Sequence, residues 1–211
     1  MNSVLHATPV ISEEDNLRAD IYALLASLLR QAPSHELLSF LGELELEETA
    51  QGEMVQAWQL LKLAAQHSNT NALESEYLKL FIGITQGELT PFASWYLTGS
   101  LMEAPLIELR KDLDLLGFAR AEPYCEPEDH IAALCEVMSL LIQQGASHER
   151  QTVFYQRHLA SWGQTFFTDL VKAPSAVFYN AVALLGQAFF KTETICLQKQ
   201  SDAVQSVRLS G

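Results

Sequence analysis

The sequence predicts an all-α protein built as an irregular bundle of many helices. Apolar residues recur at i, i+3 and i+4 spacing in almost every segment. No segment shows the sustained apolar and polar alternation, bounded by hairpin turns, that is typical of half-buried strands. With 48% hydrophobic and 18% charged residues, the 211-residue chain has enough apolar content for a substantial core.

The N-terminal half contains four helical patterns. The first starts at Ser12 and ends before Pro33, and its apolar face is Leu17, Ile21, Leu24, Leu25 and Leu28. Ser34 caps a short second helix through Leu41. The third and fourth patterns have the apolar faces Met54, Trp58, Leu61 and Ala65, and Leu73, Tyr77, Leu80 and Phe81.

Glycine and proline interrupt the pattern between Gly83 and Ala104. A helix then resumes with Pro105 at its first position, and Gly117 stops it. A loop follows up to Glu126.

The C-terminal half repeats the helical spacing. Pro127 predicts the start of the most regular helix, which ends at Gly145 and has the apolar face Ile131, Leu134, Cys135, Met138, Leu141 and Ile142. Ser147 caps a single helix with the face Tyr155, Leu159, Trp162, Phe166 and Leu170. After Pro174, a last helix buries Phe178, Val182, Leu185 and Phe189.

These elements divide the chain into an N-terminal helical part (1–116), a loop or hinge (117–126), a C-terminal helical part (127–193) and a polar tail (194–211) that we expect to be disordered. If the hinge extends, the C-terminal helices can pack on the N-terminal half of a second copy. The sequence leaves both a monomer and a domain-swapped homodimer open.

The composition argues against several classes of function. Lys and Arg number 13 against 26 Asp and Glu, a net charge of −13, which disfavours binding to nucleic acid and to anionic membrane surfaces. No apolar run approaches the ~20 residues of a membrane-spanning helix, so no membrane insertion is expected. The N-terminus lacks the pattern of a secretory signal, and we expect a cytoplasmic protein.

Recognisable catalytic motifs are missing from the sequence. There is no GxxxxGK[ST] phosphate loop, no GxGxxG and no GxSxG, and the six histidines form no HExxH pair. Cys125, Cys135 and Cys196 lack CxxC spacing and are interpreted as structural thiols. We therefore predict no enzyme, no catalytic residues, no metal site and no bound cofactor.

Two groups of residues remain as candidates for function. The first joins the 76–81 segment to Pro91–Tyr96, where Phe92, Trp95 and Tyr96 are large rigid side chains of the kind that line peptide grooves. They could equally close the core under a long loop. The second group is 126–130, where a helix starting at Pro127 would place its acids in a favourable first turn. His130 is then either a packed, hydrogen-bonded residue or part of a site.

Together these segments resemble a known family. Leu80-Phe81, then Pro91-x-x-Ser94-x-Tyr96, then Glu126-Pro-x-Asp129-His130 are similar to motifs of the TorD/DmsD family of cytoplasmic redox-enzyme maturation proteins. The resemblance extends from about Glu14 to Phe190. It implies a chaperone that binds the twin-arginine signal peptide of a molybdenum-containing reductase and holds the apoenzyme until its cofactor is inserted. The TorD branch, whose client is the trimethylamine N-oxide reductase catalytic subunit, is the most similar.

A receptor for such a peptide needs an apolar groove with acidic edges, because the peptide has a basic start followed by an apolar stretch. We expect Glu126 and Asp129 to attract the arginines and His130 to shape the groove. Tyr22 is a further candidate for the same wall. The residues expected against the apolar stretch are Leu80, Phe81, Pro91, Phe92, Trp95 and Tyr96, with Ser94 completing their motif.

Two other functions stay open at this point. The family has been associated with guanine nucleotides, which makes a GTP-binding switch or hydrolase one alternative, although no phosphate loop supports it. A helical adaptor for a folded partner is the other alternative. Binding of an isolated signal peptide separates a chaperone from such an adaptor.

Overall fold

The computed structural model describes residues 11–47, 51–83, 86–119 and 126–209, with side chains as far as residue 198. The predicted all-α fold is confirmed. Over the described ranges, the β content is one isolated antiparallel bridge, between Phe92 and His130. The helices are α1 (Glu13–Arg30), α2 (His35–Glu43), α3 (Glu53–Gln66), α4 (Thr70–Tyr77), the π-helical turn η1 (Leu78–Ile82), α5 (Ala93–Thr98), α6 (Ala104–Leu116), α7 (Ile131–Gln143), α8 (His148–His158), α9 (Gly163–Lys172) and α10 (Phe178–Leu209).

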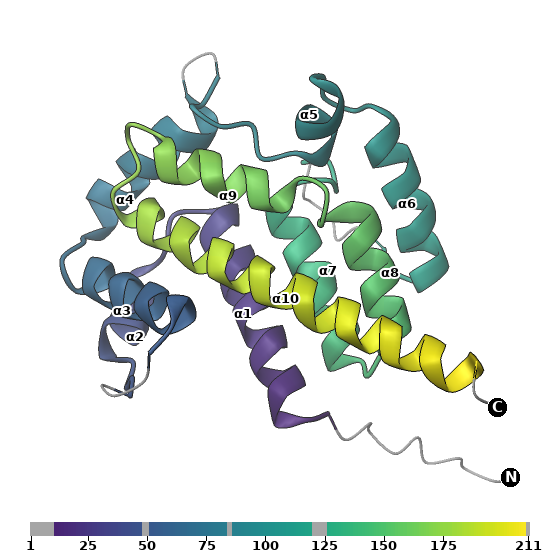
Figure 1. Cartoon of the computed structure of the whole chain (residues 1–211). Helices are drawn as coiled ribbons and strands as arrows, with labels where there is room; N and C mark the ends of the chain where they lie inside the picture. The colour runs from purple at the N-terminus through teal and green to yellow at the C-terminus, as the bar shows by residue number, and fades with distance from the viewer. Residues whose placement is uncertain (1–10, 48–50, 84–85, 120–125, 210–211) are drawn as a thin grey trace, which may run out of the picture.

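Helices from both halves of the chain share a single core (Figure 1). The N-terminal α1 packs along the C-terminal α7, and the long α10 packs on both α9 and α3. The predicted N-terminal and C-terminal parts therefore do not form separate cores within this chain. Exchange of the C-terminal helices between two copies stays a prediction, and residues 120–125 of its hinge lie outside the described residues.

Most helix ends follow local sequence signals. The side chains of Ser12, Ser34 and Ser147 each accept a hydrogen bond from a backbone N–H in the first turn of the helix that follows. Gly117 ends α6 in the left-handed conformation, with a φ of 78°. These predicted boundaries are confirmed.

The predicted start of the most regular helix is wrong. Helix α7 begins at Ile131, because Asp129 and His130 pair with an earlier segment and His130 serves as the N-cap. The Nδ1 atom of His130 accepts a hydrogen bond from the backbone N–H of Ala132 at 3.1 Å. Glu128 and Asp129 therefore lie before the helix rather than in its first turn, and a helix-dipole explanation does not apply to them.

Three other segments differ from the sequence-based expectation. The helix predicted after Ser147 is two helices, α8 and α9, separated by a turn at 159–162. The irregular stretch from Gly83 to Ala104 contains the short helix α5. Helix α10 continues to Leu209 through most of the expected disordered tail, and Leu197 is buried in its extension.

Helices α9 and α10 approach closely through two reciprocal glycine contacts. Gly163 of α9 faces the ring of Phe190, and Gly186 of α10 faces the ring of Phe167. A Cβ at either glycine would overlap the opposing ring, and both phenylalanines are buried. Only glycine allows the two helices to pack at this separation.

A buried ionic network attaches α1 to α10. The guanidinium of Arg18 donates to both carboxylate oxygens of Glu193, at 2.6 and 2.9 Å, and the Tyr22 hydroxyl donates to the same carboxylate at 3.1 Å. Burial raises the pKa of Tyr22 well above its ordinary value, so the phenol keeps its proton. Tyr22 is fully buried, and its predicted place in a binding groove is wrong.

The described residues contain no helix long and apolar enough to cross a membrane. The same part of the chain holds no group of three or more His, Cys, Asp or Glu residues arranged to bind a metal ion. Cys135 is fully buried, and burial raises the pKa of its thiol, as an inert structural cysteine requires.

We predict that Gly186→Ala destabilises the protein although alanine favours helices. The gain in helix propensity is about 1 kcal/mol. An added Cβ would lie 2.2–2.5 Å from three atoms of the buried Phe167 ring, an overlap that costs about 3 kcal/mol and outweighs that gain. Thermal unfolding followed by circular dichroism should show a lower Tm.

Gly42→Ala is the matched control, because a Cβ there meets the flexible Gln66 side chain at 3.3 Å. Its Tm should stay unchanged or rise. Equal Tm changes for the two variants would show that the α9–α10 contact does not require glycine.

Candidate functional site

The two motifs singled out from the sequence lie directly against each other. Residues 91–94 and 129–131 run antiparallel and form what we call the clamp. Two backbone hydrogen bonds of 2.9 Å join its halves, from Ile131 N to Pro91 O and from Ala93 N to Asp129 O. The clamp fixes the start of α5 beside the start of α7.

The Asp129 side chain strengthens this junction. Its Oδ2 accepts hydrogen bonds from the Ser94 backbone N–H at 2.8 Å and from the Ser94 hydroxyl at 2.6 Å. Both residues are buried. The second carboxylate oxygen, Oδ1, is also buried and accepts no hydrogen bond within the described part of the chain. Asp129 thus positions α5 and does not lie on the surface as a free acid.

His130 completes the clamp as a neutral, buried residue. Its ring lies edge-on to Phe92, with 5.0 Å between the ring centroids. Burial, with a smaller contribution from the charge of Arg30, lowers the pKa of His130 to about 4. The imidazole is therefore uncharged at neutral pH and accepts a hydrogen bond at the α7 N-terminus.

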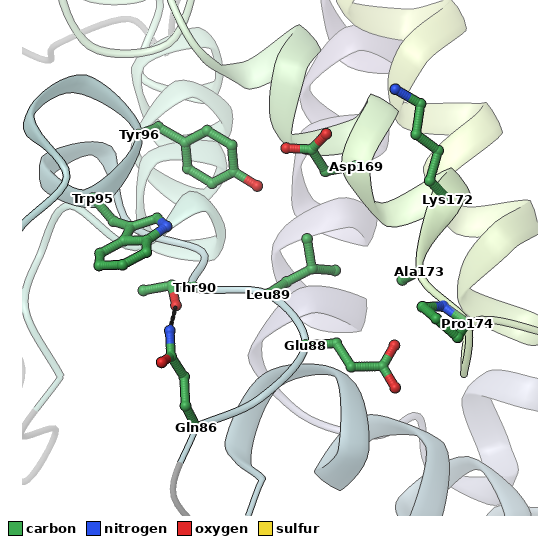
Figure 2. A pocket seen from close by; sticks show the side chains of 10 residues that line it. All are labelled: Gln86, Glu88, Leu89, Thr90, Trp95, Tyr96, Asp169, Lys172, Ala173 and Pro174. Atoms are coloured by element: carbon green, nitrogen blue, oxygen red, sulfur yellow. Dashed lines mark hydrogen bonds between the residues drawn. The ribbon is translucent and has the colours of Figure 1, made fainter.

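Two aromatic side chains of α5 line a cleft that residues of α9 also line (Figure 2). The cleft has a volume of about 280 Å³, and we call it the aromatic cleft. The indole of Trp95 is 40% exposed and lines this cleft. The lining residues are Gln86, Glu88, Leu89, Thr90, Trp95, Tyr96, Asp169, Lys172, Ala173 and Pro174.

Tyr96 supports one wall of the aromatic cleft. Its ring packs on Trp162 with 5.3 Å between centroids, and its hydroxyl points toward Asp169 (Figure 2). Burial and the neighbouring Asp169 charge raise the pKa of Tyr96. An exposed indole beside carboxylates suits a ligand that is partly apolar and partly cationic.

A second cleft, of about 300 Å³, is lined by residues of α7 and of the segment before it. Glu126, Glu128 and Glu136 surround an apolar floor, and we call this the acidic cleft. Arg30 reaches in and bonds Glu136 at 2.6 Å. The other lining residues are Leu113, Phe118, Ala119, Pro127, His130, Ala132, Ala133, Val137 and Leu140.

The predicted site residues thus fall into separate groups. Trp95 and Tyr96 line the aromatic cleft, while Glu126 and His130 line the acidic cleft. Pro91, Phe92, Ser94 and Asp129 are joined in the clamp.

Leu80 and Phe81 belong to the core side of the fold and line neither cleft. The Phe81 ring packs edge-on against Tyr179 with 5.4 Å between centroids. The Leu80 carbonyl accepts a hydrogen bond from the Leu89 N–H at 2.8 Å, which sets the course of the chain entering the aromatic cleft. Their predicted contact with a ligand stays a prediction.

Glu88 and Asp169 were not among the residues predicted from the sequence. They come from a loop and from α9, and only the fold brings them to opposite sides of one cleft (Figure 2). Glu88 also bonds the Ser175 hydroxyl at 2.5 Å, which ties the loop to the segment before α10. Neither acid belongs to a motif that could have marked it in the sequence.

We predict that Ser94→Ala lowers the free energy of unfolding by about 1–3 kcal/mol. The variant removes a hydroxyl donor from a buried carboxylate whose other oxygen already lacks a partner among the described residues. Urea unfolding measures the change. Ser100→Ala, at an exposed position just beyond α5, is the control and should change stability by less than about 0.5 kcal/mol.

We also predict that His130 contributes to acid unfolding. Its folded pKa of about 4 lies below the ordinary value of 6.5, so the unfolded chain takes up the proton first as the pH falls. This stability is fully present above pH 6.5 and is lost as the pH falls toward 4, by about 2 kcal/mol between pH 7 and 4.5.

His130→Asn retains an N-cap acceptor and removes the titrating group. Its unfolding free energy should fall less than that of the unsubstituted protein over the same pH range. Parallel pH profiles would contradict a neutral buried His130.

Comparisons with known proteins point to one family. Residues 47–168 match the nitrate reductase delta subunit family. The chaperone protein TorD of Shewanella piezotolerans is 25% identical over 203 residues, covering 87% of this chain and 94% of TorD. A protein of Haemophilus influenzae named as a probable Tat proofreading chaperone, DmsD, is 27% identical over 146 residues, covering 64% of this chain and 71% of DmsD.

A solved structure supports the same fold. The crystal structure of a protein described as a redox enzyme maturation protein, from Archaeoglobus fulgidus, superposes with a TM-score of 0.53 at 17% identity. The match covers 90% of this chain and 99% of that one. From the match over residues 47–168, the chain belongs to the nitrate reductase delta subunit family, which is the TorD/DmsD chaperone family that the clamp motifs resemble.

Proposed function

We propose that this protein is a cytoplasmic chaperone that binds the twin-arginine signal peptide and the apo form of a molybdenum-containing reductase, and assists cofactor insertion before export. The trimethylamine N-oxide reductase catalytic subunit is the proposed client. Support comes from family membership and from relatives named as TorD and DmsD chaperones. The protein acts by binding and needs no catalytic residue of its own.

The observation that carries this proposal is the way the clamp presents α5. The clamp holds the buried Ser94 fixed, and the next residue, Trp95, is 40% exposed in a cleft whose charged residues are Glu88, Asp169 and Lys172. A twin-arginine signal has a basic start and an apolar stretch. The indole supplies apolar contact at low entropic cost, while Glu88 and Asp169 attract the basic part.

The charge of the whole protein favours the same ligand. A net charge of −13 raises the encounter rate with a cationic peptide and makes binding weaken as salt increases. The acidic cleft, lined by Glu126 and His130, has the same combination of apolar floor and acidic edge.

Titration calorimetry with synthetic signal peptides tests the proposal. The unsubstituted protein should bind the peptide of trimethylamine N-oxide reductase saturably, and more tightly than peptides of other molybdoenzymes. Trp95→Ala should weaken this binding at least tenfold, or about 1.4 kcal/mol, because a partly exposed tryptophan in a cleft is a typical hot spot.

Phe40→Ala is the matched control, since Phe40 is an aromatic residue of α2 that is 59% exposed and lies outside the clefts. It should leave the affinity unchanged. Absence of binding to every twin-arginine peptide, with helicity intact by circular dichroism, would overturn the proposal. Binding of only the folded client would favour an adaptor instead.

A further inference from the structure

The turn between α5 and α6 lies at the outer edge of the molecule (Figure 1) and exposes large apolar side chains. Leu101 and Met102 belong to this turn, and they are 46% and 69% exposed. Leu97 and Ile107, on the two adjoining helices, are also exposed. Single exposed apolar residues are ordinary, whereas several close together mark a contact surface. We call these four residues the apolar ridge.

Hydrogen bonds hold the turn in place. The backbone N–H of Gly99 donates to the Trp95 carbonyl at 2.8 Å, and the backbone N–H of Glu103 donates to the Ser94 hydroxyl oxygen at 3.3 Å. Ser94 is itself held in the clamp by Asp129. The apolar ridge is therefore attached to the clamp, and its side chains are exposed from a fixed turn.

The backbone at Met102 adopts an unfavourable conformation. Its φ is 60°, and it is the one residue other than glycine with a positive φ in the part of the chain that the structure describes. A Cβ atom disfavours this region, which glycine adopts freely. Strain of this kind is concentrated at functional sites. Since the Met102 side chain is mostly exposed and adds little to the core, we expect it to contact a group outside this chain.

The charge beside the apolar ridge is negative. Glu103 follows Met102 directly, is exposed, and forms no ion pair with any residue that the structure describes. The next acid of α6, Glu108, is already paired with Lys111 at 2.7 Å and lies 3.6 Å from Arg157. A partner surface that complements the ridge is therefore apolar with a positive charge at its edge.

We infer that the apolar ridge binds the mature part of the apo reductase, at an apolar surface with a basic edge that is exposed until the reductase has folded completely. The inference rests on the proposed function and adds to it a second contact surface, separate from the site of the signal peptide. Proteins that have not completed folding expose apolar surface of this kind. The flexible, unbranched side chain of methionine adapts well to such a surface.

The shape of the ridge favours a folded domain over a short peptide. Leu101 and Met102 are exposed in a turn and line neither the aromatic cleft nor the acidic cleft. A short apolar helix is buried by lying in a groove, whereas an exposed side chain on a turn is buried only by a hollow in its partner. Next to the ridge, Leu97 and the buried Leu109 line a further cleft, of about 390 Å³, which can receive an apolar side chain of the same partner.

Substitution of the strained residue tests the inference. Met102→Gly removes the side chain and relieves the backbone, so the Tm should rise. In calorimetry, its affinity for apo trimethylamine N-oxide reductase lacking the signal peptide should fall about tenfold or more. Its affinity for the isolated signal peptide should change less than about twofold. A methionine with only a structural role would not gain stability and lose binding together.

A second variant and a control accompany this substitution. Leu101→Ser removes the other apolar side chain of the turn without changing Met102, and it should also weaken binding of the truncated apo reductase. Leu115→Ala is the matched control, because it removes a leucine that is 85% exposed near the other end of α6. It should leave both affinities unchanged.

If Met102→Gly and Leu101→Ser both bind the truncated apo reductase as tightly as the unsubstituted protein, the inference is overturned. It is also overturned if the unsubstituted protein binds the signal peptide but not the truncated apo reductase, and signal-peptide binding then stands. Binding of neither would overturn the proposed function together with the inference. A lower Tm of Met102→Gly would contradict the strain at Met102, and the affinity of Leu101→Ser would then decide.

Discussion

Asp129 accepts two hydrogen bonds from Ser94 across an interval of 35 residues, and this contact joins the start of α5 to the segment before α7. The contact fixes the first turn of α5, which presents aromatic residues on one side and Leu97 on the other. It also sets the direction in which α7 leaves the clamp. The buried Asp129 carboxylate thus fixes the position of α5 residues that line the neighbouring clefts.

Local signals in the sequence were sufficient to predict most of the helices. They did not predict how the segments between the helices pair with one another. Ser12 and Ser34 cap helices because the hydrogen bonds involve residues only three positions away. Pro127 fails as a helix start because the residues after it bond to a distant segment, and a local pattern cannot report that pairing. The break between α8 and α9 has a similar origin, since Gly163 is held against Phe190 of α10.

The candidate site could be predicted only in part, for a related reason. The motif residues mark the clamp, where hydrogen bonds join its two halves. Trp95 was identified by its residue type, and its indole is 40% exposed. No local sequence pattern marks Glu88 or Asp169. Only the tertiary fold brings them to the same cleft (Figure 2). Tyr22 is an aromatic residue of the type that lines peptide grooves, but its hydroxyl donates a hydrogen bond to Glu193 inside the core.

The clamp also determines where the chain can change in length. Its hydrogen bonds join Ser94 to Asp129, the two ends of a long segment that includes α6. The entropic cost of closing a loop grows only with the logarithm of the loop length. Doubling that length costs roughly 0.6 kcal/mol. Insertions or deletions in the connection after Gly117 therefore leave both halves of the clamp in register. Related chains can diverge in size there while keeping the same arrangement of α5 and α7.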